Sequence, residues 1–217
     1  SFYSLLEISR KNKAVMVYAS SAAVYGSLPA PQTEGTESPE NPYGFSKLMM
    51  DQIASKYSKE NPELKITGLR YFNVYGPKEF YKAQTSSMVI QLGHQILSGN
   101  SPKLFKGSEK IYRDFIYIDD VIRANINACS PERNGTYNIG TGVPRSFQEI
   151  SDLLQKELGT NLKTEYFENP YDGYQMNTQA DISSSRSYLD FCPKVSLEQG
   201  INAYIDEIKR LHGSENI

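Results

Sequence analysis

A tyrosine and a lysine stand four residues apart in the segment Tyr43-Gly44-Phe45-Ser46-Lys47. This spacing places both side chains on one face of a helix. A tyrosine is a poor base unless its phenolate is stabilised, and a neighbouring ammonium group and the positive end of a helix both do this. The pair therefore predicts proton transfer by Tyr43. Among 16 tyrosines, about one such pair arises by chance, so the surrounding sequence has to decide.

Small residues follow an apolar run upstream of this pair. Residues 14–19 have the length and composition of a buried parallel strand, and Ser21, Ala22 and Ala23 come soon after it. Ligands of open α/β sheets bind at the carboxyl ends of strands, where small residues let them approach. A serine hydroxyl at this place can bridge a substrate oxygen and the tyrosine, although a plain capping turn has the same composition. We expect Ser21 and Tyr43 to share one site.

These residues lie in an alternation of strands and helices. After the first strand, a loop over 26–42 leads to a helix over 43–58, and Pro42 suits its first turn because a missing N–H costs nothing there. Residues 66–72 form the next predicted strand. This order predicts an α/β fold with a parallel sheet, the second half of a doubly wound domain.

The later sequence predicts a smaller α/β lobe. Over this part of the chain, where the lobe is interleaved with the first domain, we expect helices and strands at 86–97, 103–105, 114–118, 119–129, 135–140, 147–158 and near the C-terminus. Ser86 or Ser87 is the predicted cap of the first of these helices, and Asp119 or Asp120 that of the second. Ser146 opens an S-x-x-E capping box.

Composition excludes several classes of protein. The chain has 217 residues, a net charge of −2 and 39% apolar residues, which is ordinary for a globular domain and gives no overall basic field to attract nucleic acid. Its apolar runs are far shorter than the roughly 20 residues that span a bilayer. Two cysteines and two histidines are too few for a disulfide framework or a histidine-based metal site. We expect no metal, no nucleic acid, no membrane insertion and a cytoplasmic location.

Taken together, the two segments around the serine and the tyrosine resemble the extended short-chain dehydrogenase/reductase superfamily, in its nucleotide-sugar-modifying branch. Ser21, Tyr43 and Lys47 match the family's Ser/Thr, Tyr and Lys. The run Arg70-Tyr71-Phe72-Asn73-Val74-Tyr75-Gly76-Pro77 is similar to the branch's strand and turn beside the nicotinamide. The resemblance implies a Rossmann-like fold and a nicotinamide cofactor.

The same resemblance divides the chain. Residues 1–78 are expected to be the C-terminal half of the dinucleotide-binding domain, and residues 79–217 mainly a substrate-binding lobe, with about 114–145 returning to the first domain. No G-x-G-x-x-G or G-x-x-G-x-x-G occurs, and the phosphate-binding turn of such a fold belongs to its first half. We expect that half to lie before Ser1, so that this piece by itself binds the dinucleotide weakly and is inactive.

Details within the branch favour one chemistry. The nucleotide-sugar dehydratases carry an Asp-Glu pair where this chain has Ala22 and Ala23, which argues against elimination of water and for epimerase or reductase chemistry. Lys82, just past the nicotinamide turn, resembles the second base of the ADP-L-glycero-D-manno-heptose 6-epimerases, although Phe80-Tyr81 stands where those enzymes have Gly-His. Further stretches that agree with these enzymes are 101–109, 113–115, 138–142, 173–175 and 178–181.

Membership of this group implies inversion of C6″ of ADP-D-glycero-D-manno-heptose through a transient 6″-keto intermediate, with tightly bound NADP, or NAD, in lipopolysaccharide core synthesis. The hydroxyl then loses a proton in one pose and gains one in the other, which calls for two acid/base groups. We assign these roles to Tyr43 and Lys82, with Ser21 holding the oxygen and Lys47 the nicotinamide ribose. The resemblance also implies a homo-oligomer, in this group a pentamer.

The pyrophosphate of such a substrate needs local cations or N–H groups. Arg113 is the main candidate, because guanidinium matches phosphate bidentately. A turn that offers N–H groups, a hydroxyl and a cation is formed by Phe105, Lys106, Gly107 and Ser108. By resemblance, the sugar-nucleotide pocket is also lined by Asn73, Gln84, Gln91 and Tyr174. Val74 flanks the nicotinamide in the same way, and the segment 138–142 is interpreted as structural.

Two other functions remain open. A UDP-hexose 4-epimerase or related nucleotide-sugar epimerase would share Ser21, Tyr43 and Lys47 but would not need Lys82, because one tyrosine serves both poses when the sugar ring flips. A non-catalytic relative that keeps the fold is the other alternative. The presence of the serine, tyrosine and lysine together argues against it, since an idle copy has no physical need of all three.

Overall fold

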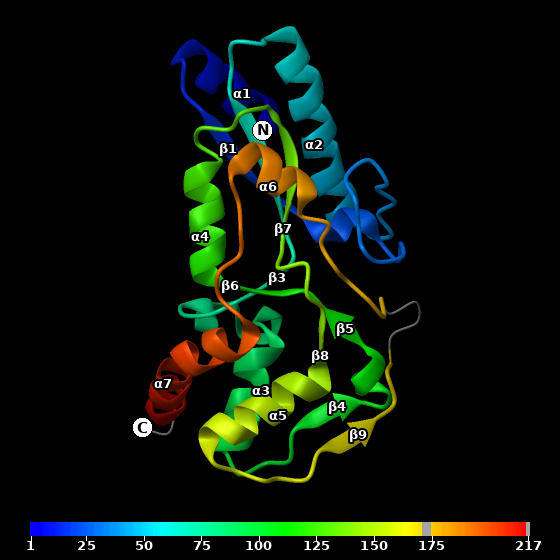
Figure 1. Ribbon diagram of the computed structural model, residues 1–217, viewed down its shortest axis with the longest axis vertical. Helices are drawn as coiled ribbons and strands as arrows, with labels where there is room; N and C mark the ends of the chain where they lie inside the picture. Colours follow the sequence, from blue (N-terminus) through cyan, green and yellow to red (C-terminus); the bar gives the residue numbers. More distant parts are fainter. Residues whose placement is uncertain (171–174, 216–217) are drawn as a thin grey trace.

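A parallel sheet lies in the upper part of Figure 1, which shows the computed structural model of the chain. The structure describes residues 1–170 and 175–215. The strand order is β1–β2–β7, with β1 Met16–Ser21, β2 Ile66–Tyr71 and β7 Gly135–Ile139. The register pairs Ser21 with Tyr71 and Tyr71 with Ile139, so the three strands end at the same edge. The predicted parallel sheet is confirmed.

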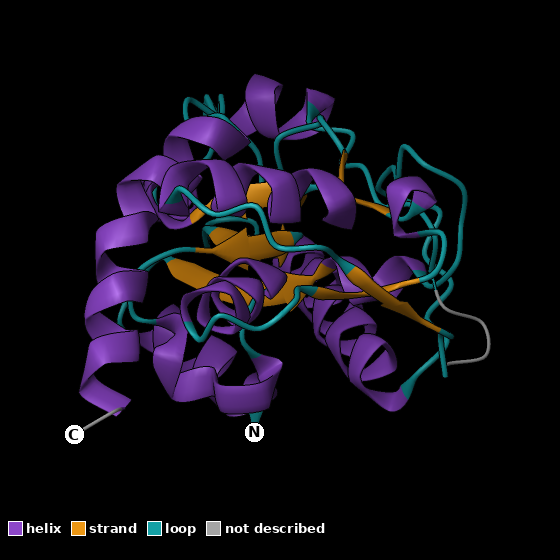
Figure 2. Cartoon of the chain, turned by 90° about the horizontal axis from the view of Figure 1, so that it is seen from below, coloured by secondary structure: helices purple, strands orange, loops and turns teal. Residues whose placement is uncertain are grey.

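Helices cover both faces of this sheet (Figure 2). The helices that do so are α1 Phe2–Lys11, α2 Pro42–Glu60, α4 Ile118–Asn127 and α6 Ser183–Leu189. Tyr18 and Ile66 pack with α1 and α2 on one face, whereas Leu69 and Ile139 pack with α4 and α6 on the other. Because strand side chains alternate between faces, both faces are buried, and the predicted doubly wound arrangement is confirmed.

The chain changes strand partner directly after β2. The backbone N–H of Phe72 donates to the Ile139 carbonyl at 3.0 Å, and that of Asn73 donates to the Asp114 carbonyl at 3.0 Å. The parallel strands that this change creates are β3 Asn73–Tyr75 and β6 Phe115–Tyr117. Strand β3 thereby carries the chain from the large sheet toward the second lobe.

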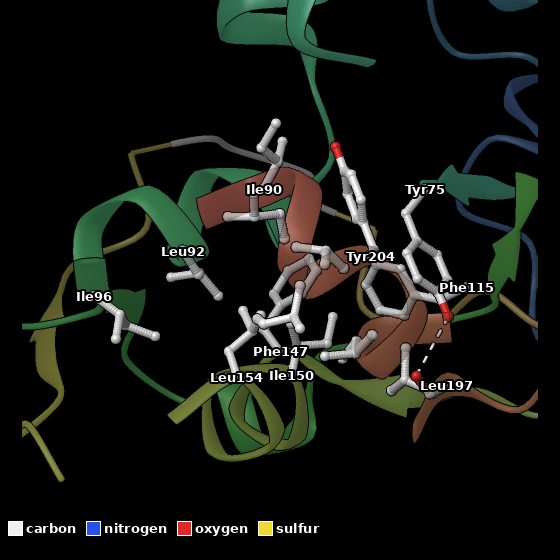
Figure 3. Packing of buried hydrophobic residues seen from close by; sticks show 14 of the residues in the cluster. Tyr75, Ile90, Leu92, Ile96, Phe115, Phe147, Ile150, Leu154, Leu197 and Tyr204 are labelled. Atoms are coloured by element: carbon white, nitrogen blue, oxygen red, sulfur yellow. Dashed lines mark hydrogen bonds between the residues drawn. The ribbon is translucent and has the colours of Figure 1, made fainter. Parts of the chain in front are cut away.

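The second lobe lies in the lower part of Figure 1, around the helices α3 Met88–Leu97, α5 Phe147–Leu158 and α7 Leu197–Glu215. Its elements are η2 Glu79–Thr85, α3 Met88–Leu97, β4 Lys103–Phe105, η3 Ser108–Lys110, β5 Tyr112–Arg113, β8 Arg145–Ser146, α5 Phe147–Leu158, β9 Glu165–Phe167 and α7 Leu197–Glu215. Strands β4 and β9 pair in parallel, and β5 and β8 antiparallel. Figure 3 shows the apolar core between α3, α5 and α7, where Tyr75 and Phe115 join this lobe to strands β3 and β6.

Two serines begin helices of this lobe, and they do so differently. Ser146 forms the predicted capping box at the start of α5 together with Glu149. Ser87 is the N-cap residue of α3, as predicted, but its hydroxyl makes no cap hydrogen bond. The hydroxyl instead donates to the Glu79 carboxylate at 2.7 Å. The cap position of α3 is therefore used to hold a neighbouring segment.

The predicted cap of α4 is wrong. Tyr117, not Asp119 or Asp120, is the N-cap residue. The Asp120 carboxylate is buried and accepts hydrogen bonds from the backbone N–H groups of Lys194 at 2.8 Å and Val195 at 3.0 Å. A distant segment thus takes the carboxylate that local sequence assigns to the helix start.

None of the helices within residues 1–170 and 175–215 is long and apolar enough to cross a membrane. The same residues contain no group of three or more His, Cys, Asp or Glu side chains placed to hold a metal ion. Cys129 and Cys192 are exposed free thiols.

Candidate active site

A cleft of about 580 Å³ lies between the end of β1, strand β3 and the segment that precedes α3. Its lining consists of Ser20, Ser21, Tyr43, Tyr71, Phe72, Asn73, Val74, Lys82, Thr85, Ser86, Ser87, Met88, Arg113, Phe115 and Phe147. The structure therefore brings together the residues predicted to be catalytic, which are Ser21, Tyr43 and Lys82. It adds the predicted binding residues Asn73, Val74 and Arg113.

The start of helix α2 positions Tyr43 at this cleft. The Asn41 side-chain oxygen accepts from the Gly44 N–H at 2.8 Å, and Pro42 occupies the first turn. Gly44 lies against the short helix η1, Ala22–Tyr25: a Cβ at Gly44 would stand 2.4 Å from the Ala23 carbonyl oxygen. The missing side chain therefore allows α2 to begin in contact with the turn after β1.

Ser21 ends β1 and faces the same cleft. It is the N-cap residue of η1, and its hydroxyl oxygen accepts from the Ala23 N–H at 3.1 Å. A hydroxyl that accepts one hydrogen bond still has an O–H to donate. Ser21 is thus held in place by the turn while its hydroxyl can contact a ligand oxygen.

Lys47 lies one helical turn beyond Tyr43. Its ammonium group is 5.7 Å from the centroid of the Tyr43 ring and donates to the Ala19 carbonyl at 2.9 Å. The contact ties α2 to the end of β1 and holds a positive charge beside the tyrosine. Lys47 does not itself line the cleft, so it is placed to act on Tyr43 or on a ligand at the end of the strand.

Asp51 continues the same stripe of α2, four residues after Lys47. Its buried carboxylate accepts from the hydroxyls of Tyr18 at 3.0 Å and Ser20 at 2.9 Å. The Arg70 Nε donates to it at 3.0 Å. Burial raises the pKa of Asp51, and the charge of Arg70 opposes that shift. The carboxylate joins α2 to β1 and β2 directly behind the cleft.

Arg70 extends this buried network to the loop before α2. Its guanidinium pairs with Glu37 and donates to the Tyr25 hydroxyl at 2.9 Å. The Tyr25 hydroxyl donates in turn to the Asn138 side-chain oxygen at 2.6 Å. Burial raises the pKa of Tyr25, while the charge of Arg70 opposes the shift. A charged, hydrogen-bonded layer therefore supports helix α2 and the turn after β1.

Lys82 comes from η2, between β3 and α3, and it is exposed at the cleft wall. Ala83 next to it has φ +47°, a value that favours glycine. Phe80 packs against the apolar core of the second lobe, and its ring centroid is 5.8 Å from that of Tyr81. Tyr81 is 89% exposed. The pair Phe80-Tyr81 thus anchors one residue of the segment in the core and leaves the other in solvent.

Arg113 is buried at the end of β5. Its guanidinium donates to the carbonyl oxygens of Tyr112, at 2.9 Å, and Gln175, and it lies 5.6 Å from the centroid of the Phe147 ring. Among the described residues that line the cleft, Lys82 and Arg113 are cations and none is Asp or Glu. Cationic walls favour an anionic ligand.

Other predicted binding residues stand apart from the cleft lining. The Gln91 side chain donates to the Ser86 carbonyl at 2.7 Å, so it supports a lining residue from behind. Tyr174 lies outside the described residues. Gln84 belongs to η2, and its side chain is likewise outside the described part.

The turn after β4 also lies away from the cleft. The lining does not include Phe105, Lys106, Gly107 or Ser108. The Phe105 ring packs against that of Phe167 at 5.0 Å between centroids. Lys106 forms an exposed ion pair with Glu168, and Ser108 is fully buried. In this structure the turn therefore joins β4 to β9.

Three supporting residues were absent from the sequence-based site. Asp51 had a readable signal, because it repeats the four-residue spacing that Tyr43 and Lys47 begin. Gly44 and Glu79 had none, since their roles depend on an approach of η1 to α2 and on a bond across the segment before α3.

The chain is similar in sequence and in fold to known nucleotide-sugar epimerases. ADP-L-glycero-D-manno-heptose-6-epimerase of Brachyspira hyodysenteriae is 38% identical over 97% of this chain and 68% of that protein. The crystal structure of the Helicobacter pylori ADP-L-glycero-D-manno-heptose-6-epimerase superposes with a TM-score of 0.87 and 44% identity, over 96% of this chain and 64% of that one. UDP-glucose 4-epimerase of Thermotoga maritima has a TM-score of 0.87 and 29% identity, over 97% of this chain and 68% of that one.

The chain spans about two thirds of the length of these relatives. The 38% and 44% identities to the two ADP-heptose epimerases confirm the resemblance that the sequence indicated. A family model described as the NAD dependent epimerase/dehydratase family matches residues 2–140, the stretch that holds Ser21, Tyr43 and Lys82. The chain therefore belongs to the NAD-dependent epimerase/dehydratase family.

Proposed function

We propose that the natural protein carrying this sequence inverts C6″ of ADP-D-glycero-D-manno-heptose to give the L-glycero epimer, as a step of lipopolysaccharide core synthesis. The observation that carries the proposal is that Lys82 and Tyr43 line one cleft together with Ser21. A second base near the tyrosine is what distinguishes this reaction from epimerisation with a single tyrosine. The names of two of the similar proteins support the choice of substrate.

The chain's own residues would move one proton in each half of the reaction. The C6″ hydroxyl loses its proton when the carbon is oxidised to a ketone, and the oxygen regains a proton when the ketone is reduced on its other face. If the end of the sugar rotates between the two steps, the oxygen points to a different wall each time. Tyr43 and Lys82 would serve the two poses, and Ser21 would hold the oxygen. Positioned acid/base groups typically contribute about 10²–10⁴-fold each.

The end of β1 fits a nicotinamide group. Lys47 is fixed there by the Ala19 carbonyl, where it can reach a ribose hydroxyl, and Val74 supplies an apolar wall inside the cleft. Tyr43 would lie beside the same ribose. When bound, NADP, or alternatively NAD, supplies the acceptor and donor of hydride. These residues would hold and orient its reactive end.

The sugar nucleotide would occupy the rest of the cleft. Arg113 is the proposed partner of the pyrophosphate, because its buried guanidinium is presented between two carbonyl oxygens and an aromatic ring. Asn73 would contact the sugar from strand β3. The remaining residues that we propose for substrate binding are Gln84, Gln91, Phe105, Lys106, Gly107, Ser108 and Tyr174.

We further propose which part of the chain binds the cofactor and which part binds the substrate. Residues 1–78 would contribute the C-terminal half of the dinucleotide-binding domain, and residues 79–217 mainly the substrate lobe, with about 114–145 returning to the first domain. The protein would act in the cytoplasm as a homo-oligomer, with a pentamer as the form that the resemblance implies. The 217-residue chain by itself would be inactive and would bind the cofactor weakly.

A UDP-hexose 4-epimerase is the alternative that a specific observation favours. The Thermotoga maritima enzyme of that activity shares the fold at a TM-score of 0.87. Such an enzyme would use Ser21, Tyr43 and Lys47 in the same way but would not need Lys82. A non-catalytic relative is disfavoured, because the serine, tyrosine and lysine are brought to one place.

The two epimerase functions are separated by one substitution and two substrates. Turnover of ADP-D-glycero-D-manno-heptose and of UDP-glucose would be measured for the natural protein and for Lys82→Met. We expect turnover of the heptose only, reduced about 10²–10⁴-fold by the substitution. Lys56→Met, at a side chain that is 81% exposed on α2, is the matched control. Turnover of UDP-glucose that survives Lys82→Met would establish the alternative.

A further inference from the structure

Glu79 is a buried carboxylate that the proposed reaction does not use. It begins η2 and is 4% exposed. Its oxygens accept hydrogen bonds from the Ser87 N–H at 2.7 Å, the Ser87 hydroxyl at 2.7 Å and the Gly76 N–H at 3.3 Å. One carboxylate therefore joins the turn after β3 to the N-cap residue of α3.

The two groups that Glu79 connects are the two ends of the segment that carries Lys82. Gly76 precedes this segment, and Ser87 follows it as the N-cap residue of α3. Ser87 also lines the cleft, as does Lys82. The bonds between Glu79 and Ser87 thus connect the two ends of the segment that carries Lys82.

The side-chain hydrogen bonds within the segment are local. Thr85 and Ser86 hydroxyls donate to the carbonyls of Lys82 and Ala83, each at 2.7 Å, which are local turns. Ala83 has φ +47°, a value that an alanine adopts only where surrounding contacts impose it. The Ser87 hydroxyl donates to Glu79 rather than capping its own helix. These features indicate a segment held in one shape from outside.

We propose that Glu79 is a positioning residue that holds Lys82 at the distance and angle needed for proton transfer on one face of the substrate carbon. The inference rests on the proposed function, in which Lys82 serves one pose and Tyr43 the other. The inference predicts that loss of Glu79 impairs the half-reaction that depends on Lys82 and spares the half-reaction that depends on Tyr43. A general loss of packing would impair both.

The test uses the full natural protein with its nicotinamide cofactor. Formation of reduced nicotinamide in a single turnover is measured from each of the two C6″ epimers, for the wild type, Lys82→Met and Glu79→Gln. Glu63→Gln, at an exposed glutamate, is the matched control. We expect Lys82→Met to slow oxidation of one epimer, and Glu79→Gln to slow the same epimer about 10- to 100-fold, as misplacement of a catalytic group does. The other epimer should keep its rate within about twofold.

Ser87→Ala provides a second variant, in case Glu79→Gln does not fold. It removes the hydroxyl donor and leaves the buried carboxylate bonded to two backbone N–H groups. We expect a smaller loss for the same epimer. Hydrogen exchange of the amides of residues 78–87 is measured in parallel and should be faster in both variants, because the hydrogen bonds between Glu79 and Ser87 are weakened.

The outcomes separate the inference from the proposed function. If neither epimer reacts in the wild type, the proposed function fails, and unchanged hydrogen exchange in Glu79→Gln would then overturn the inference separately. If Lys82→Met leaves both epimers unaffected, Lys82 is not the second base and the inference fails with that assignment. If Lys82→Met is selective but Glu79→Gln slows both epimers equally or neither, the proposed function stands and the positioning role is wrong.

Discussion

The ammonium group of Lys47 lies 5.7 Å from the centroid of the Tyr43 ring while it donates to the Ala19 carbonyl at the end of β1. One lysine therefore couples the tyrosine on α2 to the strand edge where the cleft begins. Asp51, four residues further along α2, makes the next tie, to the Ser20 hydroxyl. Polar contacts of Lys47 and Asp51 with β1 thus support the orientation of Tyr43 toward the cleft.

Removal of the tyrosine hydroxyl tests the role of α2. We predict that Tyr43→Phe lowers kcat about 10²–10⁴-fold, because the proton of the substrate hydroxyl loses its acceptor in one pose. The free energy of unfolding should be unchanged, since the Tyr43 side chain is 56% exposed. Steady-state kinetics and urea unfolding measure the two quantities. Tyr3→Phe, at a side chain 54% exposed on α1, is the control, and equal activity of both variants would refute the role of Tyr43.

The close approach of α2 to η1 makes Gly44 sensitive to the smallest side chain. We predict that Gly44→Ala lowers the free energy of unfolding by about 1–3 kcal/mol, because the new Cβ overlaps a backbone oxygen and forces a shift. Activity should fall with it, since Tyr43 is the neighbouring residue. Gly213→Ala, in open space on α7, is the control and should stabilise the helix by roughly 0.5–1 kcal/mol. A Gly44→Ala protein as stable as the wild type would show that the approach is looser than described.

The ion pairs that the buried Arg70 forms with Glu37 and Asp51 behind the cleft predict that the free energy of unfolding depends on pH. Burial would by itself raise the pKa of Glu37, but the Gly35 N–H and the Arg70 guanidinium outweigh it, so the pKa lies below its ordinary value of 4.5. Glu37 therefore contributes stability above pH 4.5, and this contribution is lost as the pH falls through the lowered pKa. Asp51, whose pKa is raised by burial, acts in the opposite sense.

The contribution of Glu37 is isolated by comparing Glu37→Gln with the wild type. We predict that the free energy of unfolding falls less steeply on acidification in Glu37→Gln than in the wild type, and that the two curves converge at low pH. Urea unfolding between neutral pH and about pH 3 measures it. Glu132→Gln, at an exposed glutamate, should follow the wild type. Parallel curves for Glu37→Gln and the wild type would contradict the ion pair with Arg70.

Recognition of the pyrophosphate is tested at Arg113. We predict that Arg113→Lys weakens binding of the ADP-sugar about tenfold, or about 1.4 kcal/mol, because a lysine keeps the charge but loses the planar fork that matches phosphate oxygens. Calorimetric titration with the substrate nucleotide measures the affinity. Arg133→Lys, at a residue that does not line the cleft, serves as the control. If Arg113→Lys binds the ADP-sugar as tightly as the wild type does, Arg113 does not bind the pyrophosphate, which must then lie in another part of the cleft.

Local patterns predicted the framework of the site. The apolar run before Ser21, the proline that opens α2 and the spacing of Tyr43 and Lys47 are all properties of short segments, and each is found in the structure. The parallel sheet followed because a strand, a helix and a strand alternate over these residues. The resemblance then indicated Lys82, which lines the same cleft.

Contacts between segments that are distant in the sequence could not be predicted from these local patterns. Asp120 looked like a helix cap, but two backbone N–H groups from the segment before α7 take its carboxylate. Arg70 was recognised only as part of a motif, because its pairing with Asp51 and Glu37 depends on how α2 and the preceding loop fold over β2. Such bonds join residues whose spacing in the sequence carries no periodic signal.

The most direct test of the proposed reaction uses the full natural protein, ADP-D-glycero-D-manno-heptose and no added cofactor. The configuration at C6″ is followed by proton NMR. Conversion to the L-glycero epimer, without net oxidation, is the result that two bases around a tightly held nicotinamide predict. A sugar that keeps its configuration, even after NADP⁺ is added, would contradict the assignment of Tyr43 and Lys82 to this reaction.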